Sequence, residues 1–151
     1  MAFNLENTLV IGISATALFD LSEADKLFTK EYIKNADNAI EIYRDYMLKN
    51  ENVPLHEGIG FPLIKALLDL NRYQKNGDTP LVEVVIMSRN SPDTGVRVLN
   101  TIRKLKLNIT RSAFTAGESS ADYLDAFDVD LFLTTNESDA QKVIDNRVCA
   151  S

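Results

Sequence analysis

The chain has 151 residues, of which 45% are hydrophobic and 25% charged, and this length and composition suit one globular domain with a buried core. Its net charge of −6 argues against a nucleic-acid or anionic-membrane partner, and no apolar run approaches the roughly 20 residues that span a bilayer. The single cysteine, Cys149, excludes an internal disulfide, and the N-terminus lacks the pattern of a secretory signal. We therefore expect a cytoplasmic protein.

The first predicted strand covers residues 8–13, an apolar run followed by small polar side chains that include Ser14 and Thr16. Helical patterns come next, including an apolar stripe of Ala39, Ile42, Tyr43, Tyr46 and Met47. This helical stretch delays the return of the chain to the sheet. We interpret residues 22–58 as a cap-like insertion after the first strand. Extra helices packed on one face of the sheet would suit the same pattern equally well.

The second predicted strand, residues 82–87, is a β-branched run with one charge, which is typical of a strand buried on both faces of a parallel sheet. Ser91 is the predicted N-cap of the next helix, and Pro92 is its predicted first residue. Residues 88–90 (Ser-Arg-Asn) therefore fall at the carboxyl end of the strand, where open α/β sheets bind ligands. A well-capped turn without a ligand is the competing interpretation.

The rest of the chain continues the alternation of helices and strands. It is predicted to form a helix from Pro62, a strand at 109–115, a short helix after Ser119, a strand at 129–133, a helix capped by Asn136, and the start of a fifth strand at 147–150. Such alternation implies right-handed βαβ units and a mostly parallel sheet. No linker or repeat divides the chain, so the prediction is a single α/β, Rossmann-like domain over residues 1–151.

The predicted strand ends share hydroxyl and amide side chains: Ser14, Thr16, Ser88, Asn90, Thr115, Thr134 and Thr135. Such groups can donate hydrogen bonds to a phosphate without like-charge repulsion. A divalent cation needs two or more anionic oxygens, so no metal site is predicted. The candidate cationic partners for a phosphate are Arg89, Arg97 and Arg111. The only histidine, His56, lies on a predicted loop, and no nucleophile elbow is present, which argues against a serine-nucleophile enzyme.

Four segments of the chain stand out, at residues 13–19 (ISATALF), 60–67 (GFPLIKAL), 88–97 (SRNSPDTGVR) and 114–118 (FTAGE). In sequence, order and spacing they resemble the cytosolic type I 5′-nucleotidase family. The resemblance implies a haloacid dehalogenase-like (HAD-like) three-layer sandwich with strand order 4-1-2-3 and a helical insertion after the first strand. It also implies a family that removes phosphate from nucleoside monophosphates with magnesium and an aspartate nucleophile.

The resemblance covers only the N-terminal half of the family's members, and it implies that their Asp-x-Asp nucleophile motif lies in the other half. On the phosphatase pattern, the first-strand aspartates fall at Ser14 and Thr16, the second-strand hydroxyl is kept as Ser88, the lysine falls near Ser120, and the final acidic pair falls at Thr134 and Thr135. Loss of a nucleophile typically costs orders of magnitude in rate. We therefore expect no catalytic residue, no firmly bound magnesium and no efficient phosphatase activity in this chain alone.

The predicted ligand is a nucleoside monophosphate or phosphate. The predicted binding residues come from the strand ends and from the segments that resemble the family: Ser14, Thr16, Ser88, Arg89, Asn90, Thr115, Gly117 and Glu118. Three interpretations remain open. The chain is a 5′-nucleotidase family member whose catalytic half is lost or supplied by another chain, a non-catalytic nucleotide- or phosphate-binding module, or a structural domain that docks on a catalytic subunit. The candidate protein partners are a catalytic half-domain and, in a homo-oligomer, further copies of the chain.

Overall fold

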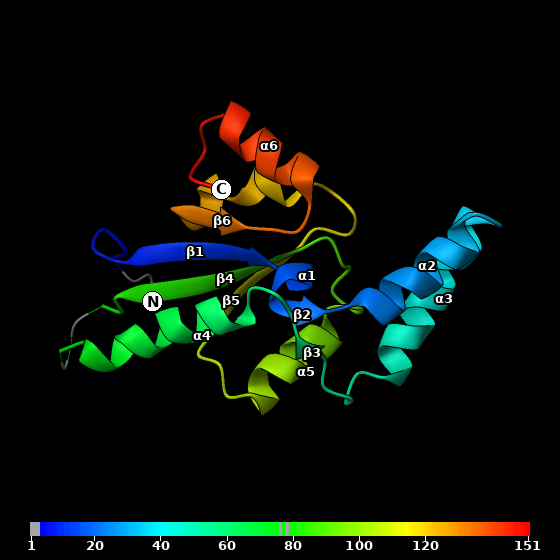
Figure 1. The fold of residues 1–151 in the computed structure, drawn as a ribbon, viewed down its shortest axis with the longest axis horizontal. Helices are drawn as coiled ribbons and strands as arrows, with labels where there is room; N and C mark the ends of the chain where they lie inside the picture. Colours follow the sequence, from blue (N-terminus) through cyan, green and yellow to red (C-terminus); the bar gives the residue numbers. More distant parts are fainter. Residues whose placement is uncertain (1–3, 76, 78) are drawn as a thin grey trace.

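The protein is built on a four-stranded parallel sheet (Figure 1). A computed structural model describes residues 4–75, 77 and 79–151. The strands stand in the order β5-β4-β1-β6, with bounds β1 Leu9–Ser14, β4 Val82–Ser88, β5 Arg111–Phe114 and β6 Leu131–Leu133. The predicted α/β class and mostly parallel sheet are confirmed. Within the described part of the chain, no helix has the length and apolar character needed to cross a membrane.

The centre of the sheet is the pair β1 and β4, whose interiors are buried. They pair in parallel from Leu9 opposite Val82 to Ser14 opposite Met87. The shorter strands β5 and β6 flank them as edges. Because the four strands run in the same direction, their carboxyl ends reach one edge of the sheet, and the side chains that follow them are brought close together.

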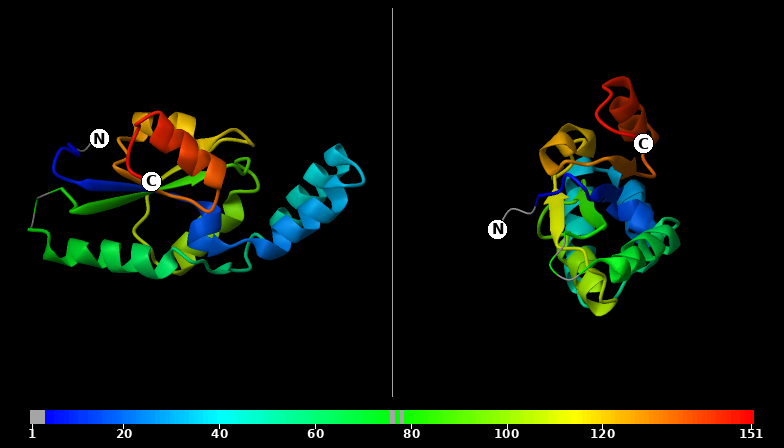
Figure 2. Two further views of the ribbon diagram at one scale, coloured as in Figure 1. Left: turned by 45° about the horizontal axis from the view of Figure 1, so that its top comes forward. Right: turned by 90° about the vertical axis from the view of Figure 1, so that its left-hand side faces the viewer.

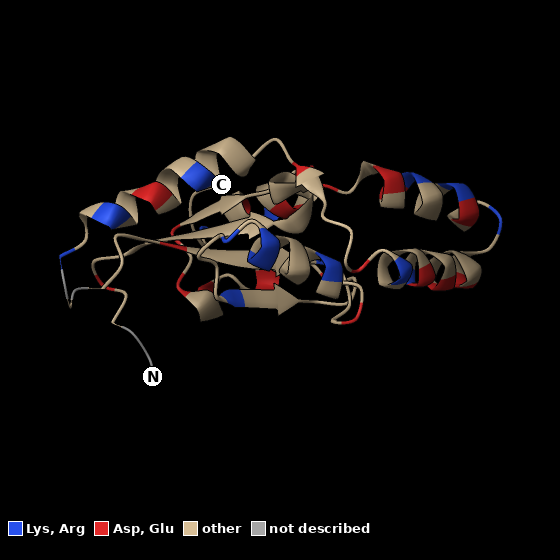
Figure 3. Ribbon diagram, turned by 90° about the horizontal axis from the view of Figure 1, so that it is seen from below, with Lys and Arg blue, Asp and Glu red and all other residues tan. Residues whose placement is uncertain are grey.

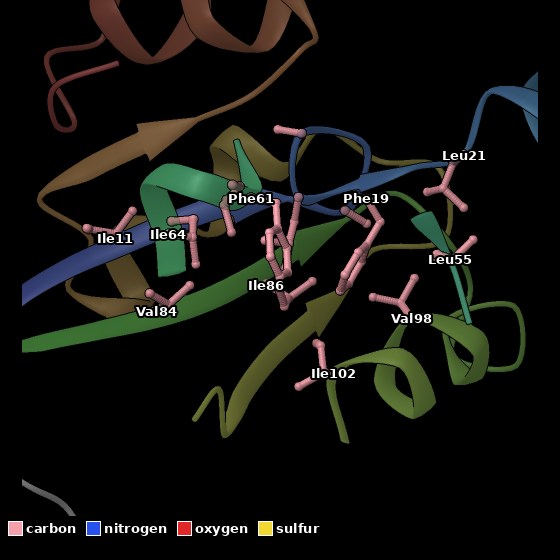
Figure 4. Packing of buried hydrophobic residues seen from close by; sticks show 14 of the residues in the cluster. Ile11, Phe19, Leu21, Leu55, Phe61, Ile64, Val84, Ile86, Val98 and Ile102 are labelled. Atoms are coloured by element: carbon pink, nitrogen blue, oxygen red, sulfur yellow. The ribbon is translucent and has the colours of Figure 1, made fainter. Parts of the chain in front are cut away.

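One face of the sheet is covered by α1 (Ala15–Leu18), by α4 (Phe61–Asp69), which continues as the 3₁₀ turn η1 (Leu70–Tyr73), and by α5 (Val96–Lys104). Ile11 and Ile86 of the sheet pack here with Ile64 of α4 and Ile102 of α5 in one buried layer (Figure 4). Truncation of a large aliphatic side chain in such a layer typically costs about 2–5 kcal/mol. This layer therefore fixes α4 and α5 against the strands.

The opposite face is covered by the segment after β5 and by α6 (Glu137–Asp145). Val10, Val85 and Met87 form a second buried cluster on this side with Leu124 and Val143. Successive residues of a strand point to opposite faces, so β1 and β4 contribute alternate residues to two separate cores. This explains why both strands are apolar along nearly their whole length.

The helices α2 (Ser22–Tyr32) and α3 (Ala36–Lys49) form a hairpin that extends beyond the carboxyl ends of the strands (Figures 1 and 2). Charged residues of both signs lie along it, whereas the strands are largely uncharged (Figure 3). The chain leaves the hairpin through β3 (His56–Glu57), which pairs antiparallel with β2 (Phe19–Asp20). This two-stranded pairing holds together the segments that enter and leave the hairpin.

The helix after β4 begins later than the sequence predicts. It was predicted to start at Pro92 with Ser91 as its N-cap, but α5 begins at Val96 and is preceded by Gly95. The hydroxyl of Ser91 donates to the carboxylate of Asp93, and residues 92–95 form a turn. Ser91 therefore stabilises the turn and does not cap the helix.

Two elements near the C-terminus also differ from the prediction. The short helix after Ser119 is a pair of 3₁₀ turns, η2 (Ser120–Tyr123) and η3 (Asp125–Phe127). The predicted fifth strand is a single bridge between Ala150 and Leu131. The cap of α6 is confirmed, because the side-chain oxygen of Asn136 accepts a 2.9 Å hydrogen bond from the backbone N–H of Asp139.

Candidate functional site

A cleft of about 720 Å³ opens at the carboxyl ends of β1, β4 and β6. Its floor is polar and consists of the strand ends and the loops that follow them. Its wall comes from the helical hairpin and is largely apolar. Open parallel sheets bind their ligands at this edge, so the cleft is the candidate functional site.

Three hydroxyl groups form a chain of close contacts on the floor. Ser14 Oγ lies 3.2 Å from Thr16 Oγ1, which in turn lies 2.7 Å from Thr135 Oγ1. Ser14 Oγ also accepts a hydrogen bond from the backbone N–H of Ala17 as the N-cap of α1. The chain joins the end of β1 to the end of β6. Because hydroxyl protons rotate freely, these groups can donate to an anion placed above them.

The loop after β4 is fixed by the loop after β5. Residues 115–117 donate their backbone N–H groups to the carbonyl oxygens of residues 88–90 over 2.7–3.2 Å. Ala116 and Gly117 adopt the left-handed conformation, with φ of 50° and 98°, which allows this sharp turn. These bonds hold the backbone at Arg89 in place.

The side chain of Arg89 is held as firmly as its backbone. Its Nε donates to Oδ2 of Asp139 over 3.2 Å, and its Nη2 donates to Oδ1 over 2.6 Å. The Ser119 hydroxyl also donates to Asp139 Oδ1, over 2.6 Å. Burial acts to raise the pKa of Asp139, but the hydrogen bonds from Arg89 and Ser119 outweigh it and hold that pKa below its usual value. Asp139 is therefore ionised at neutral pH.

The apolar wall of the cleft consists of four side chains of the hairpin and its entry: Leu21, Phe28, Ile40 and Tyr43. The rings of Phe28 and Tyr43 meet edge to face, with centroids 6.0 Å apart. The hydroxyl of Tyr43 donates to Oδ1 of Asn90 over 2.8 Å, which connects the wall to the floor. Burial, with the nearby charge of Asp25, raises the pKa of Tyr43 to about 12, so this hydroxyl stays a hydrogen-bond donor at neutral pH.

Two charged residues of the hairpin also line the cleft. Arg44 pairs with Asp93 in the turn after β4. The carboxylate of Asp25 has no ion pair with another described residue, and burial together with the negative charge of Asp20 raises its pKa. The wall therefore presents one neutralised cation and one carboxylate that titrates above its usual range.

The structure brings together six of the eight predicted binding residues, and these line the cleft: Ser14, Thr16, Ser88, Arg89, Asn90 and Gly117. Thr115 and Glu118 are not among the lining residues. The hydroxyl of Thr115 is turned to its own loop and donates to the Glu118 carbonyl over 2.6 Å. The carboxylate of Glu118 accepts a 2.5 Å hydrogen bond from the hydroxyl of Tyr123.

The other two candidate arginines lie outside the cleft lining, and so does His56. Arg97 is buried and donates to the carbonyl of Val53 over 3.0 Å. Arg111 makes two hydrogen bonds to Glu83 between β5 and β4. His56 is exposed in β3. Of the three arginines considered as phosphate partners, only Arg89 lines the cleft.

Sequence reasoning missed Asp139 and Tyr43 as residues of the site. Asp139 lies in the first turn of α6, where an acidic residue is ordinarily explained by the helix dipole. Tyr43 belongs to the apolar stripe of α3, which is typical of packing. Each residue is identified as part of the site by its contact in the structure: Asp139 binds Arg89, and Tyr43 binds Asn90. In both pairs the partner lies some fifty residues away in the chain, so its neighbours in the sequence do not reveal it.

The donors of the floor do not fit a divalent cation. Among the described residues, no group of three or more His, Cys, Asp or Glu side chains is placed so that it could hold a metal ion. The hydroxyls of Ser14, Thr16 and Thr135 carry no charge, and the carboxylate oxygens of Asp139 are occupied by Arg89 and Ser119. Magnesium prefers carboxylate oxygens together with water and phosphate, so this floor suits an anion better than a metal ion.

Comparison with known proteins identifies the family to which the chain belongs. The family model for 5′-nucleotidase matches residues 1–151. The cytosolic 5′-nucleotidase 1B of Homo sapiens is 28% identical over 149 residues, which cover 97% of this chain and 23% of that protein. The chain therefore spans less than a quarter of the length of this relative. No solved structure gives a significant match.

Proposed function

The chain belongs to the 5′-nucleotidase family, and from this premise we propose that its cleft binds a nucleoside 5′-monophosphate, while the nucleophile for phosphate release comes from outside the chain. This membership confirms the resemblance to the family that four segments of the sequence indicated. The observation that supports the proposal most directly is the division of the cleft into a polar floor and an apolar wall, which matches a ligand with one anionic and one aromatic end.

We assign the phosphate of the ligand to the floor and its nucleoside to the wall. The hydroxyls of Ser14, Thr16 and Thr135 can donate to phosphate oxygens. The rings of Phe28 and Tyr43 offer the kind of surface on which a planar base packs. On this assignment the hairpin is a cap over a HAD-like domain, and the residues from about 22 to 58 form the insertion.

The chemistry of the floor supports an inactive role for this chain alone. A serine nucleophile needs a base within hydrogen-bond reach, and the Ser14 hydroxyl contacts the hydroxyl of Thr16 and the backbone N–H of Ala17. Neither can take a proton from serine at neutral pH. The catalytic carboxylates, and the magnesium that the family uses, would then belong to a catalytic half-domain or another chain. The cytosolic relative supports a cytoplasmic setting.

Ligand binding tests the first part of this proposal. AMP, IMP and inorganic phosphate are titrated into the chain by calorimetry, and the melting temperature is followed in parallel. A ligand at ten times its dissociation constant should add about 1.4 kcal/mol of stability. Thr16→Val should weaken AMP binding, whereas Thr110→Val, on an exposed segment outside the cleft, should not. If none of these compounds binds, the proposal is rejected.

Phosphate release tests the second part. We expect release of phosphate from AMP by this chain to stay at the background rate, with or without magnesium, because the floor lacks a nucleophile that can be activated. Turnover above background that disappears in Ser14→Ala would show instead that the chain is itself a phosphatase. Binding and turnover are separate readouts, so either part of the proposal can fail without the other.

A further inference from the structure

The cleft has little positive charge to offer an anion. Its charged lining residues within the described part of the chain are Asp25, Arg44, Arg89 and Asp139, which sum to zero. Arg44 is shared between Asp93 and Glu41. A phosphate that binds here must therefore find its cationic partner locally, and Arg89 is the candidate on the floor.

Arg89 keeps hydrogen-bond donors in reserve. A guanidinium has five N–H groups, and Asp139 receives one from Nε and one from Nη2. About three donors are therefore left, on a side chain that is 41% exposed. The Asp139 side chain, in contrast, is only 5% exposed, and it also accepts from Ser119. The buried carboxylate thus fixes one edge of the guanidinium, and the remaining donors belong to an exposed side chain that lines the cleft.

The same pairing disfavours a metal ion. A divalent cation on this floor would need the carboxylate oxygens of Asp139, because Ser14, Thr16 and Thr135 supply only neutral oxygens. Taking Asp139 away from Arg89 would break two charge-assisted hydrogen bonds to a buried carboxylate. In addition, the released guanidinium would repel the cation.

We propose that Arg89, held by Asp139, is the cationic anchor for the phosphate, and that this chain binds a phosphate monoester without a divalent cation. The inference rests on the proposed function because it concerns the same cleft and the same ligand class. It adds to that function the residue that binds the phosphate, Arg89, and the expectation that binding does not depend on magnesium.

The experiment compares AMP with adenosine by calorimetry on the full chain. Each is titrated in buffer with EDTA and again in buffer with millimolar magnesium chloride at matched ionic strength. We expect AMP to bind in EDTA with a dissociation constant within about twofold of its value in magnesium. We expect adenosine to bind more weakly than AMP under both conditions, because it lacks the phosphate.

Three variants assign the effect to Arg89. Arg89→Gln should weaken AMP binding by about tenfold or more and leave adenosine binding unchanged. Because this change leaves Asp139 buried without its partner, the double variant R89Q/D139N removes both charges together and should show the same loss for AMP. Arg111→Gln is the matched control, since Arg111 is an equally paired arginine outside the cleft, and it should leave AMP affinity unchanged.

The outcomes separate this inference from the proposed function. If AMP binds only with magnesium, or if both Arg89 variants fold and bind AMP as well as the unmodified chain, the inference is wrong and the proposed function stands. If neither AMP nor phosphate binds under any condition, the proposed function fails and the inference fails with it. Binding of AMP in EDTA that is lost in both Arg89 variants supports both.

Discussion

The hydroxyl of Tyr43 donates a 2.8 Å hydrogen bond to Oδ1 of Asn90, and this contact ties the middle of α3 to the loop after β4. The ion pair of Arg44 with Asp93 follows one residue later along the helix. A third contact, from Arg97 of α5 to the carbonyl of Val53, holds the segment that leaves the hairpin. The hydrogen bond of Tyr43 is partly buried, whereas the ion pair of Arg44 is exposed. We therefore expect the Tyr43 contact to contribute more than the Arg44 contact to holding the hairpin over the cleft.

Tyr43→Phe removes the hydroxyl and keeps the ring. We expect it to lower the free energy of unfolding by about 1 kcal/mol, because Oδ1 of Asn90 loses its donor at a partly buried site. Urea unfolding measures the change. The control is Tyr46→Phe, whose lost hydroxyl contacts the Glu23 carboxylate at an exposed site and should cost less than about 0.5 kcal/mol. Equal losses in the two variants would contradict the role given to Tyr43.

Alkaline pH tests the environment of the same hydroxyl. Its pKa is about 12 in the folded protein against an ordinary value of 10.0, so the folded state holds this proton more tightly than the unfolded chain. The stabilisation is complete below pH 10 and is lost as the pH rises toward 12, by on the order of 2–3 kcal/mol for two pKa units. Unfolding free energies measured across this range should fall less steeply in Tyr43→Phe, and a tyrosinate absorbance titration should lose its latest phase.

The sequence predicts the sheet well because the strands are determined by local patterns. The run at residues 82–87 is apolar on both faces, and the structure places alternate members of it in two different cores. The hairpin is recognisable as two helices, but its position is not, because it depends on contacts such as Tyr43 with Asn90 between segments far apart in the chain. Helix starts that depend on one side chain are less certain: Asn136 caps α6 as predicted, whereas Ser91 bonds to Asp93 and does not cap α5.

The same distinction applies to the candidate site. Hydroxyl residues at strand ends are predictable because parallel strands deliver their ends to one edge, and Ser14, Thr16 and Ser88 all line the cleft. The partner of an arginine is not predictable from its neighbours. Arg89 follows the carboxyl end of β4 and pairs with Asp139 at the cleft, whereas Arg111 begins β5 and pairs with Glu83 of β4.

Arg111→Gln should reduce stability without affecting the cleft. Arg111 donates from Nε and Nη2 to the two carboxylate oxygens of Glu83, over 2.7 and 3.0 Å, and also to the carbonyl of Phe127. Its loss leaves a half-buried carboxylate without a partner, and we expect a cost of about 2 kcal/mol in urea unfolding. The double variant E83Q/R111Q should recover part of this loss. A double variant less stable than the single one would contradict this account of the pair.

Asp25→Asn tests whether the wall of the cleft repels an anion. Asp25 lines the cleft and has no ion pair with another described residue, so its negative charge opposes a bound phosphate. We expect the variant to bind AMP about threefold more tightly and adenosine as before, because only the charged ligand senses the removed charge. Calorimetry at low ionic strength measures both affinities. The matched control is Asp45→Asn, which removes the same charge from an exposed position on α3 outside the cleft lining and should change neither affinity.

The difference in AMP affinity between Asp25→Asn and the unmodified chain should depend on pH in a definite direction. Burial and the charge of Asp20 raise the pKa of Asp25 above its ordinary value of 3.8, so Asp25 loses its charge at a higher pH than an exposed aspartate would. As the pH falls toward that raised pKa, the unmodified chain becomes neutral at this position and resembles Asp25→Asn. The ratio of the two AMP affinities should therefore approach one in acid and be largest at neutral pH. A ratio that grows as the pH falls would show that the carboxylate of Asp25 does not act on the bound phosphate through its charge.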